Sequence, residues 1–137
     1  MKYASEDLKK EHEGILQGLA ILEKMTSLVV AGSTVPVSDI EAMIDFLKLF
    51  ADKCHHGKEE EILFPAMEKH GIPNERGPIG QMLLEHVEGR KFIRGLSSSV
   101  SSGKLDAPLF TSNARGYIEL LMAHINKENT VLFPLGD

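Results

Sequence analysis

The stretch HHGKEEEILFP at His55–Pro65 occurs a second time in the chain, as HINKENTVLFP at His124–Pro134. Aligned without a gap, the two copies share a His-x-x-x-Glu pair, a lysine before the glutamate and the final Leu-Phe-Pro. Residues four apart lie above one another on the same face of an α-helix, so each copy can direct an imidazole nitrogen and a carboxylate toward one point. Two such helices facing each other would offer the nitrogen and oxygen donors that suit iron or manganese.

Length and charge restrict the class of protein. The 137 residues suffice for one domain with one hydrophobic core, and the net charge of −5 argues against a nucleic-acid partner. No apolar run approaches the length of a transmembrane helix, and the N-terminus shows no apolar signal region, so we expect a cytoplasmic protein without membrane contact. A single cysteine, Cys54, excludes an internal disulfide and is expected to be a small buried side chain.

Helical periodicity runs through most of the chain, and nothing alternates with the period of a strand. Ser38 and Glu41 form a predicted capping box, and Asp106 followed by Pro108 predicts another helix start. The four predicted helices run from Ser5 to Ala31–Gly32, from Ser38 to His70, from Pro78 into the serine-rich stretch before Gly103, and from Asp106 to Phe133–Pro134. Short connections between amphipathic helices predict the all-α class, as an antiparallel, up-down-up-down four-helix bundle that forms a single domain over residues 1–137.

Each predicted helix carries a histidine on its inner face: His12, His55, His86 and His124. With a rise of ~1.5 Å per residue, His12 and His55 lie within about 3 Å of the same height, measured from the turn between their helices. The same comparison at the turn between the last two helices brings His86 and His124 to within about 3 Å. The four histidines are therefore expected at one level of the bundle.

The inner face of the second helix is predicted to continue past the histidine, and Pro65 is expected to bend or thin its last turns. At helical spacing this face carries Leu47, Ala51, His55, Glu59, Ile62 and Ala66.

Burying the two glutamates of the repeated motif without partners is costly, and a bound metal is the simplest compensation. We therefore predict a dinuclear site whose metal ligands are His12, His55, Glu59, His86, His124 and Glu128. The repeat aligns His56 with Ile125, so His56 is left out of this set, and with Glu60 and Glu61 it is assigned to a solvated face or to hydrogen bonds around the ligands. Arg90, one turn after His86, is expected to pair with a carboxylate near the site.

Four segments resemble the hemerythrin-like family, also called the HHE cation-binding domain. They are EHEGI around His12, EHVEGR around His86 and the two copies of the repeated stretch. The resemblance covers nearly the whole chain. It implies an antiparallel four-helix bundle around a non-haem di-iron site, in which Glu59 and Glu128 bridge two iron ions together with an oxo or hydroxo group.

The sequence departs from the oxygen-carrying members of this family at Arg90. Those proteins have a second histidine one turn after the residue that matches His86, which brings their histidine ligands to five. Arginine has no lone pair to give a metal, so here each iron would have two histidines and one open position. We therefore expect quick oxidation in air, and reaction or sensing in place of reversible oxygen storage.

The resemblance implies a protein that binds or reacts with a small ligand, such as dioxygen, peroxide or nitric oxide, in sensing or in a redox or stress response. The alternative is a regulatory or iron-handling module whose metal site gates folding or partner binding. Family members that repair iron centres carry an additional cysteine-bearing N-terminal domain, absent from this sequence, which makes repair a weaker expectation. A structural zinc site fits poorly because the ligand set is rich in carboxylates. The sequence names no protein partner or reductase, and it does not decide between turnover and sensing.

Overall fold

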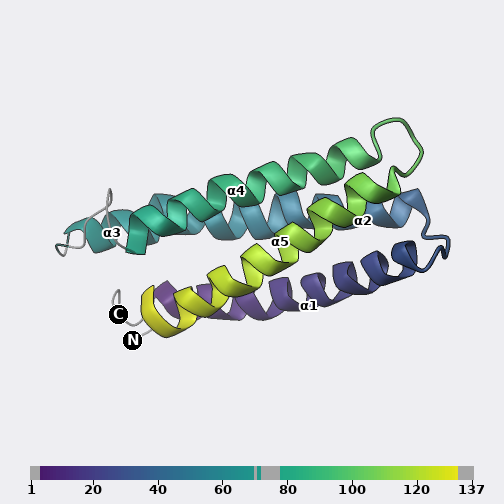
Figure 1. The fold of residues 1–137 in the computed structure, drawn as a ribbon. Helices are drawn as coiled ribbons and strands as arrows, with labels where there is room; N and C mark the ends of the chain where they lie inside the picture. The colour runs from purple at the N-terminus through teal and green to yellow at the C-terminus, as the bar shows by residue number, and fades with distance from the viewer. Residues whose placement is uncertain (1–3, 70, 72–77, 133–137) are drawn as a thin grey trace.

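The computed structural model describes residues 4–69, 71 and 78–132, which are almost entirely helical and contain no strand, so the predicted all-α class is confirmed. The helices pack side by side as a bundle, and α1 begins at the end of the bundle where η3 finishes (Figure 1). The elements, with η for a π-helix, are α1 (Ala4–Val30), α2 (Val37–Phe46), η1 (Leu47–His56), η2 (Glu59–Leu63), α3 (Phe64–Lys69), α4 (Pro78–Ser99), α5 (Ala107–Lys127) and η3 (Glu128–Leu132).

The helix boundaries agree with the predicted ones at most ends. Asp106 caps α5 as expected, because its carboxylate accepts a hydrogen bond from the Leu109 backbone N–H at 3.2 Å. The capping box at Ser38 is wrong: the helix starts one residue earlier, and the carbonyl oxygen of Pro36 already accepts the N–H of Asp39 at 3.0 Å. The predicted helix ends at His70 and at Phe133–Pro134 lie outside the described residues.

Within the described residues, each copy of the repeated stretch contains a segment with the wider hydrogen-bonding pattern of a π-helix. His55 lies in η1, Glu59 opens η2, and Glu128 opens η3. Such turns are rare in proteins, but those that occur often lie at functional sites. Pro65 stands in the first turn of α3, directly after η2, and the rod from α2 to α3 stays helical through it.

The π turns change the inner face of this rod. Leu47, Ala51, His55 and Glu59 are buried as predicted, but the prediction is wrong for Ile62, which is 61 % exposed, and for Ala66, which is also exposed. Leu63 and Met67 are buried in their place. Four residues make more than one full turn of an α-helix, so positions four apart gradually move off the buried face. A π-helix has more residues per turn, and this keeps positions four apart on the buried face.

Two hydrophobic clusters fill the bundle, and a polar layer separates them. Along α1, for example, Leu8 belongs to the smaller cluster and Ile15 to the larger one, with His12 between them. Tyr117 is fully buried in the larger cluster. Cys54 is exposed, so its predicted burial is wrong, because the inward-facing side of this turn is taken by the neighbouring histidine. Within the described ranges, no helix is both long and apolar enough to cross a membrane.

Candidate metal centre

The polar layer between the two clusters gathers seven titratable side chains. None of them is more than 3 % exposed. All six predicted ligands are among them, and the seventh is His56; the full set is His12, His55, His56, Glu59, His86, His124 and Glu128. The four long helical segments of the bundle, α1, α2 to α3, α4 and α5 to η3, thus place these polar side chains at one level. The ligand role of each residue stays a prediction.

The inner nitrogens of the predicted histidines face the two carboxylates. Nε2 of His12 lies 3.0 Å from Oε1 of Glu128, and Nε2 of His124 lies 3.3 Å from the same oxygen. Nε2 of His86 lies 3.0 Å from Oε1 of Glu59, and Nε2 of His55 lies 3.5 Å from its Oε2. Each carboxylate is therefore shared between histidines of two different rods.

The seven side chains form two overlapping groups, and within each group the potential ligand atoms lie within 4.8 Å of one another. Glu59 belongs to both groups, which places two candidate metal positions side by side with one carboxylate between them. The members are His56, Glu59, His86 and His124 in the first group, and His12, His55, Glu59 and Glu128 in the second.

The inner atoms of these groups fit a bound metal pair. Neither carboxylate oxygen of Glu59 makes a hydrogen bond, and the same holds for Oε2 of Glu128 and Nε2 of His55. Buried polar atoms without hydrogen bonds are costly, and native proteins rarely leave them so. Oxygen and nitrogen donors in this number suit iron or manganese, so a metal pair would satisfy the atoms that the protein leaves unsatisfied.

The outer nitrogens of two histidines are fixed in the same way in both copies of the motif. Nδ1 of His55 lies 2.9 Å from a carboxylate oxygen of Glu11, and Nδ1 of His124 lies 2.7 Å from one of Glu85. The lysine shared by the copies holds each carboxylate in turn: Lys58 donates to Glu11, and the Lys127 ammonium donates to Glu85 at 2.8 Å. A carboxylate on the outer nitrogen orients the ring and raises its basicity toward a metal.

Arg90 organises a second set of outer contacts. Its guanidinium donates to Asp52 at 2.8 Å and to Glu60 at 2.7 Å, which confirms the expected pairing with carboxylates near the site. The same oxygen of Glu60 lies 2.7 Å from Nδ1 of His86. Glu60 therefore serves His86 as the surrounding hydrogen-bond partner that the sequence allowed for.

His56 lies inside the bundle. Its ring is 3 % exposed and stacks on the ring of His86, with centroids 3.9 Å apart and planes 12° apart. Of the two alternatives predicted for His56, the solvated face is therefore wrong, and a place among the groups around the ligands remains. Two adjacent histidines, His55 and His56, are both buried on the inner side of η1. The repeat contained a signal for this, because its counterpart Ile125 is apolar and is buried as well.

Charge states differ among the buried histidines. Burial lowers the pKa of His56 to about 4, although Asp52 opposes the shift, so the ring is neutral and keeps a lone pair near neutral pH. Burial would also lower the pKa of His55, but Glu128 and Glu59 outweigh it and raise that pKa to about 10. Burial and the neighbouring Glu128 raise the pKa of Glu59. A cation that binds here therefore has to displace protons, which couples metal binding to pH.

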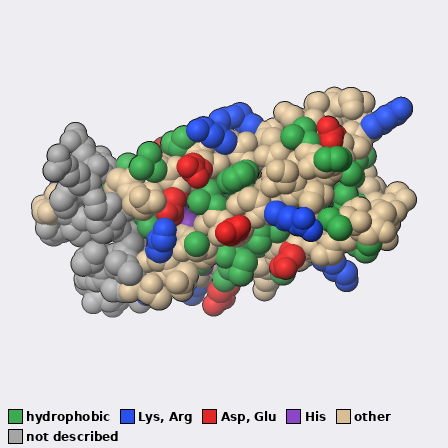
Figure 2. Space-filling model, viewed as in Figure 1, with side chains coloured by type: hydrophobic (Ala, Val, Ile, Leu, Met, Phe, Trp, Pro, Cys, Tyr) green, Lys and Arg blue, Asp and Glu red, His purple; other side chains and the backbone are tan. Residues whose placement is uncertain are grey.

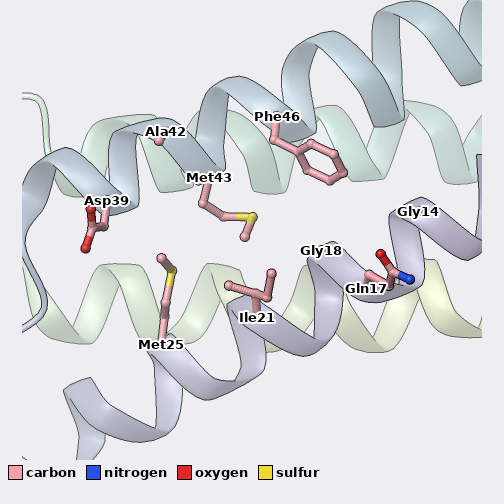
Figure 3. Close-up of a pocket in the computed structure, with 9 residues that line it drawn as sticks. All are labelled: Gly14, Gln17, Gly18, Ile21, Met25, Asp39, Ala42, Met43 and Phe46. Atoms are coloured by element: carbon pink, nitrogen blue, oxygen red, sulfur yellow. The ribbon is translucent and has the colours of Figure 1, made fainter.

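The seven side chains of the polar layer are almost completely covered by the rest of the protein. In the face shown in Figure 2, histidine is visible only as one small area between acidic and basic side chains. A surface groove of about 410 Å³ lies elsewhere, between α1 and α2, and none of its lining residues belongs to the polar layer (Figure 3). Phe46 packs over Gly18 in this groove, where a Cβ would meet the ring at 2.4 Å.

Comparisons with known proteins agree with the site. The family model of the hemerythrin HHE cation-binding domain matches residues 3–136. The chain is 30 % identical over 136 residues to the iron-sulfur cluster repair protein YtfE of Edwardsiella ictaluri, a match that covers 93 % of this chain and 61 % of that protein. It is 25 % identical over 135 residues to an uncharacterised protein of Mycobacterium tuberculosis, covering 96 % of this chain and 52 % of the relative.

The chain thus spans between about half and three fifths of the length of these relatives. No solved structure matches it significantly. The family model extends over nearly all of the sequence, including both copies of the repeated motif, and so the chain belongs to the hemerythrin HHE cation-binding domain family.

Proposed function

We propose that this chain is a non-haem di-iron protein that binds or reacts with a small ligand, such as dioxygen, peroxide or nitric oxide, in a redox or stress response. One observation carries the proposal: two groups of buried nitrogen and oxygen donors share Glu59. The family match supports a metal site, and the similarity to a repair protein supports a link with iron.

The residues of the layer have separate tasks in this proposal. His12, His55, His86 and His124 would hold the metal ions through the Nε2 atoms that face the two carboxylates, and Glu59 and Glu128 would supply carboxylate oxygens to them. Iron held there would supply redox chemistry and a binding place for ligands that gain negative charge. Because two carboxylates offset only part of the charge of two divalent ions, the centre favours such ligands over neutral ones.

The surrounding residues keep the donors in position and exclude water. Glu11 and Glu85 hold the outer nitrogens of His55 and His124, so each ring presents the other nitrogen inward. The hydrophobic clusters above and below the layer limit competing water. This low-polarity enclosure strengthens the attraction between the centre and the negative charge that a ligand gains on binding.

The proposal extends to the finer features expected from the sequence. They are an antiparallel up-down-up-down order, a single domain over residues 1–137, an oxo or hydroxo bridge between two iron ions, and a cytoplasmic location without a nucleic-acid or membrane partner. The start of α1 and the end of η3 at one end of the bundle support the up-down order (Figure 1). The net charge of −5 supports the absence of a nucleic-acid partner.

A second candidate function is iron handling, including the repair of iron-sulfur clusters. It is favoured by the 30 % identity to the repair protein YtfE, although this chain spans only 61 % of that relative. Transfer of iron from the loaded chain to a metal-free iron-sulfur protein would distinguish this function, since a protein that only binds a small ligand retains its iron.

Metal analysis and optical spectra test the main proposal. The chain is expressed with sufficient iron, reduced without air, and then exposed separately to air, peroxide and nitric oxide. We expect close to two iron ions per chain and an absorption change with at least one of the three ligands. Stoichiometric zinc without iron, or two iron ions whose spectrum ignores all three ligands, would contradict the proposal.

A further inference from the structure

We propose that His56 is a fifth histidine ligand of the centre and that it makes the two metal positions unequal. The inference rests on the proposed metal site and adds a residue that only the first copy of the repeated stretch contains. One position would then have three histidines and the other two.

The first support is the position of His56. Its ring is buried, and it forms one of the two donor groups with Glu59, His86 and His124, whose ligand atoms lie within 4.8 Å of one another. Without His56, that group would hold only two histidines and the shared glutamate. A ring nitrogen of His56 at this distance from the other donors of the group can act as a metal ligand.

The second support is the outer nitrogen of the ring. Nδ1 of His56 lies 3.7 Å from Oδ1 of Asp52, which leaves Nε2 as the nitrogen that can face the centre. Asp52 is in turn held by Arg90 at 2.8 Å. Through Asp52 and Glu60, the Arg90 guanidinium thus connects the outer sides of His56 and His86. Metal-binding histidines almost always direct the second nitrogen to such a partner.

The third support comes from the internal repeat. A histidine that merely filled space in the core would need no matching changes around it. Here four positions differ together between the half of the bundle formed by η1, η2 and α4 and the half formed by α1, α5 and η3. Three of them are polar only on the side of His56, and the fourth has a carboxylate there and an uncharged amide on the other side. The polar residues are His56, Asp52, Glu60 and Arg90, and their counterparts are Ile125, Leu121, Asn129 and Leu16.

Arg90 gains a meaning from this arrangement. It stands where the oxygen-carrying members of the family have their fifth histidine, and it has no lone pair for a metal. The guanidinium fixes Asp52, which lies against the outer nitrogen of His56. The fifth histidine is therefore supplied by η1 in place of α4, and the expectation of two histidines at each metal position is replaced by three and two.

The decisive experiment uses the full chain loaded without air with ⁵⁷Fe(II), as wild type and as His56→Ile. Isoleucine is the residue that the second copy tolerates at this position. We expect two iron ions and two distinct Mössbauer doublets for the wild type. In His56→Ile one iron should bind at least about 10-fold more weakly, because losing only a hydrogen-bond partner of a ligand already weakens metal binding by about that factor. One doublet should change, and the other should persist.

Cys54→Ala is the matched control, because Cys54 is a nearby exposed residue and its removal should leave both doublets unchanged. Two iron ions bound by His56→Ile with wild-type affinity and an unchanged spectrum would overturn the inference. Where circular dichroism shows that His56→Ile does not fold, Asp52→Asn replaces it: a change confined to one doublet supports the inference, and an unchanged spectrum refutes it.

A failure of the proposed di-iron function gives a different result. In that case the wild type itself binds no iron, and Co(II) becomes the probe. A weaker Co(II) affinity and a changed visible spectrum in His56→Ile would support the ligand role of His56 without iron. Identical Co(II) binding in both proteins, or none in the wild type, would refute it.

Discussion

The metal centre has two sides, one with His55 and His86 from η1 and α4, and one with His124 and His12 from α5 and α1. One set of outer hydrogen bonds is alike on the two sides, and another set differs. Glu11 with Lys58 supports His55, and Glu85 with Lys127 supports His124, with the same kinds of groups at similar distances. The shared lysine of the repeated motif is explained by this task. Since both copies keep it, we infer that His55 and His124 need the same orientation.

The other two histidines have unlike partners. Nδ1 of His86 faces the carboxylate of Glu60 at 2.7 Å, whereas Nδ1 of His12 faces the side-chain amide oxygen of Asn129 at 2.9 Å. A carboxylate increases the basicity of the ring more than an amide does, so the two histidines are unequal as donors. The comparison teaches that the repeat preserved one pair of outer contacts and allowed the other pair to diverge.

The largest expected effect concerns the residue that both sides share. Glu59→Ala removes the carboxylate common to the two donor groups, so both metal positions should be lost and the iron content should fall from two per chain to near zero. Elemental analysis of the desalted protein measures this. Glu61→Ala, at an exposed neighbouring position, should keep both ions. Two ions retained by Glu59→Ala would show that the two metal positions do not share this carboxylate.

The next effect tests the contacts that the two sides have in common. Glu11→Gln and Glu85→Gln each remove a charged outer partner, and each should weaken iron binding by about 10- to 100-fold. Competition with a chelator measures the affinity, and the exposed Glu13→Gln is the control. A difference of more than about 10-fold between the two variants would break the equivalence of the two sides.

A pH experiment on the metal-free chain examines the same contact. The hydrogen bond to His124, with weaker opposition from burial, lowers the pKa of Glu85 from 4.5 to about 2. The stability that the ionised carboxylate contributes is therefore complete above pH 4.5 and is lost as the pH falls toward 2. The urea midpoints of Glu85→Gln and the wild type should differ above pH 4.5 and converge below it. A constant difference across this range would contradict the assignment.

The smallest effect concerns the contacts that differ. Arg90→Leu gives the His86 side the residue that stands at Leu16 on the other side, and it releases Asp52 and Glu60. Because these ion pairs are partly exposed, the free energy of unfolding should fall by only about 1 kcal/mol or less. Urea unfolding measures this, with the exposed Arg94→Leu as control. A loss several times larger would mean that Arg90 acts through more than these two pairs.

The fold and most of the candidate site could be predicted from the sequence because both depend on the spacing of residues within single helices. His55 with Glu59 and His124 with Glu128 were recognisable because a helix places residues four apart on one face. His12 and His86 followed from the rise per residue, which converts chain distance into height. Helical spacing alone misplaced Ile62 and Ala66, because it assumes α-helical turns throughout.

What the sequence by itself determined is the helical class, the paired motifs and the level at which six polar side chains meet, all of which depend on spacing within single helices. Only the tertiary structure decided that His56 is buried, that Leu63 and Met67 point inward, and which outer partner each histidine has. Helical spacing does not predict the π turns, and these turns change the face that each residue presents. The contact between Glu11 and His55 joins residues 44 apart in sequence, so it exists only after two rods have packed together.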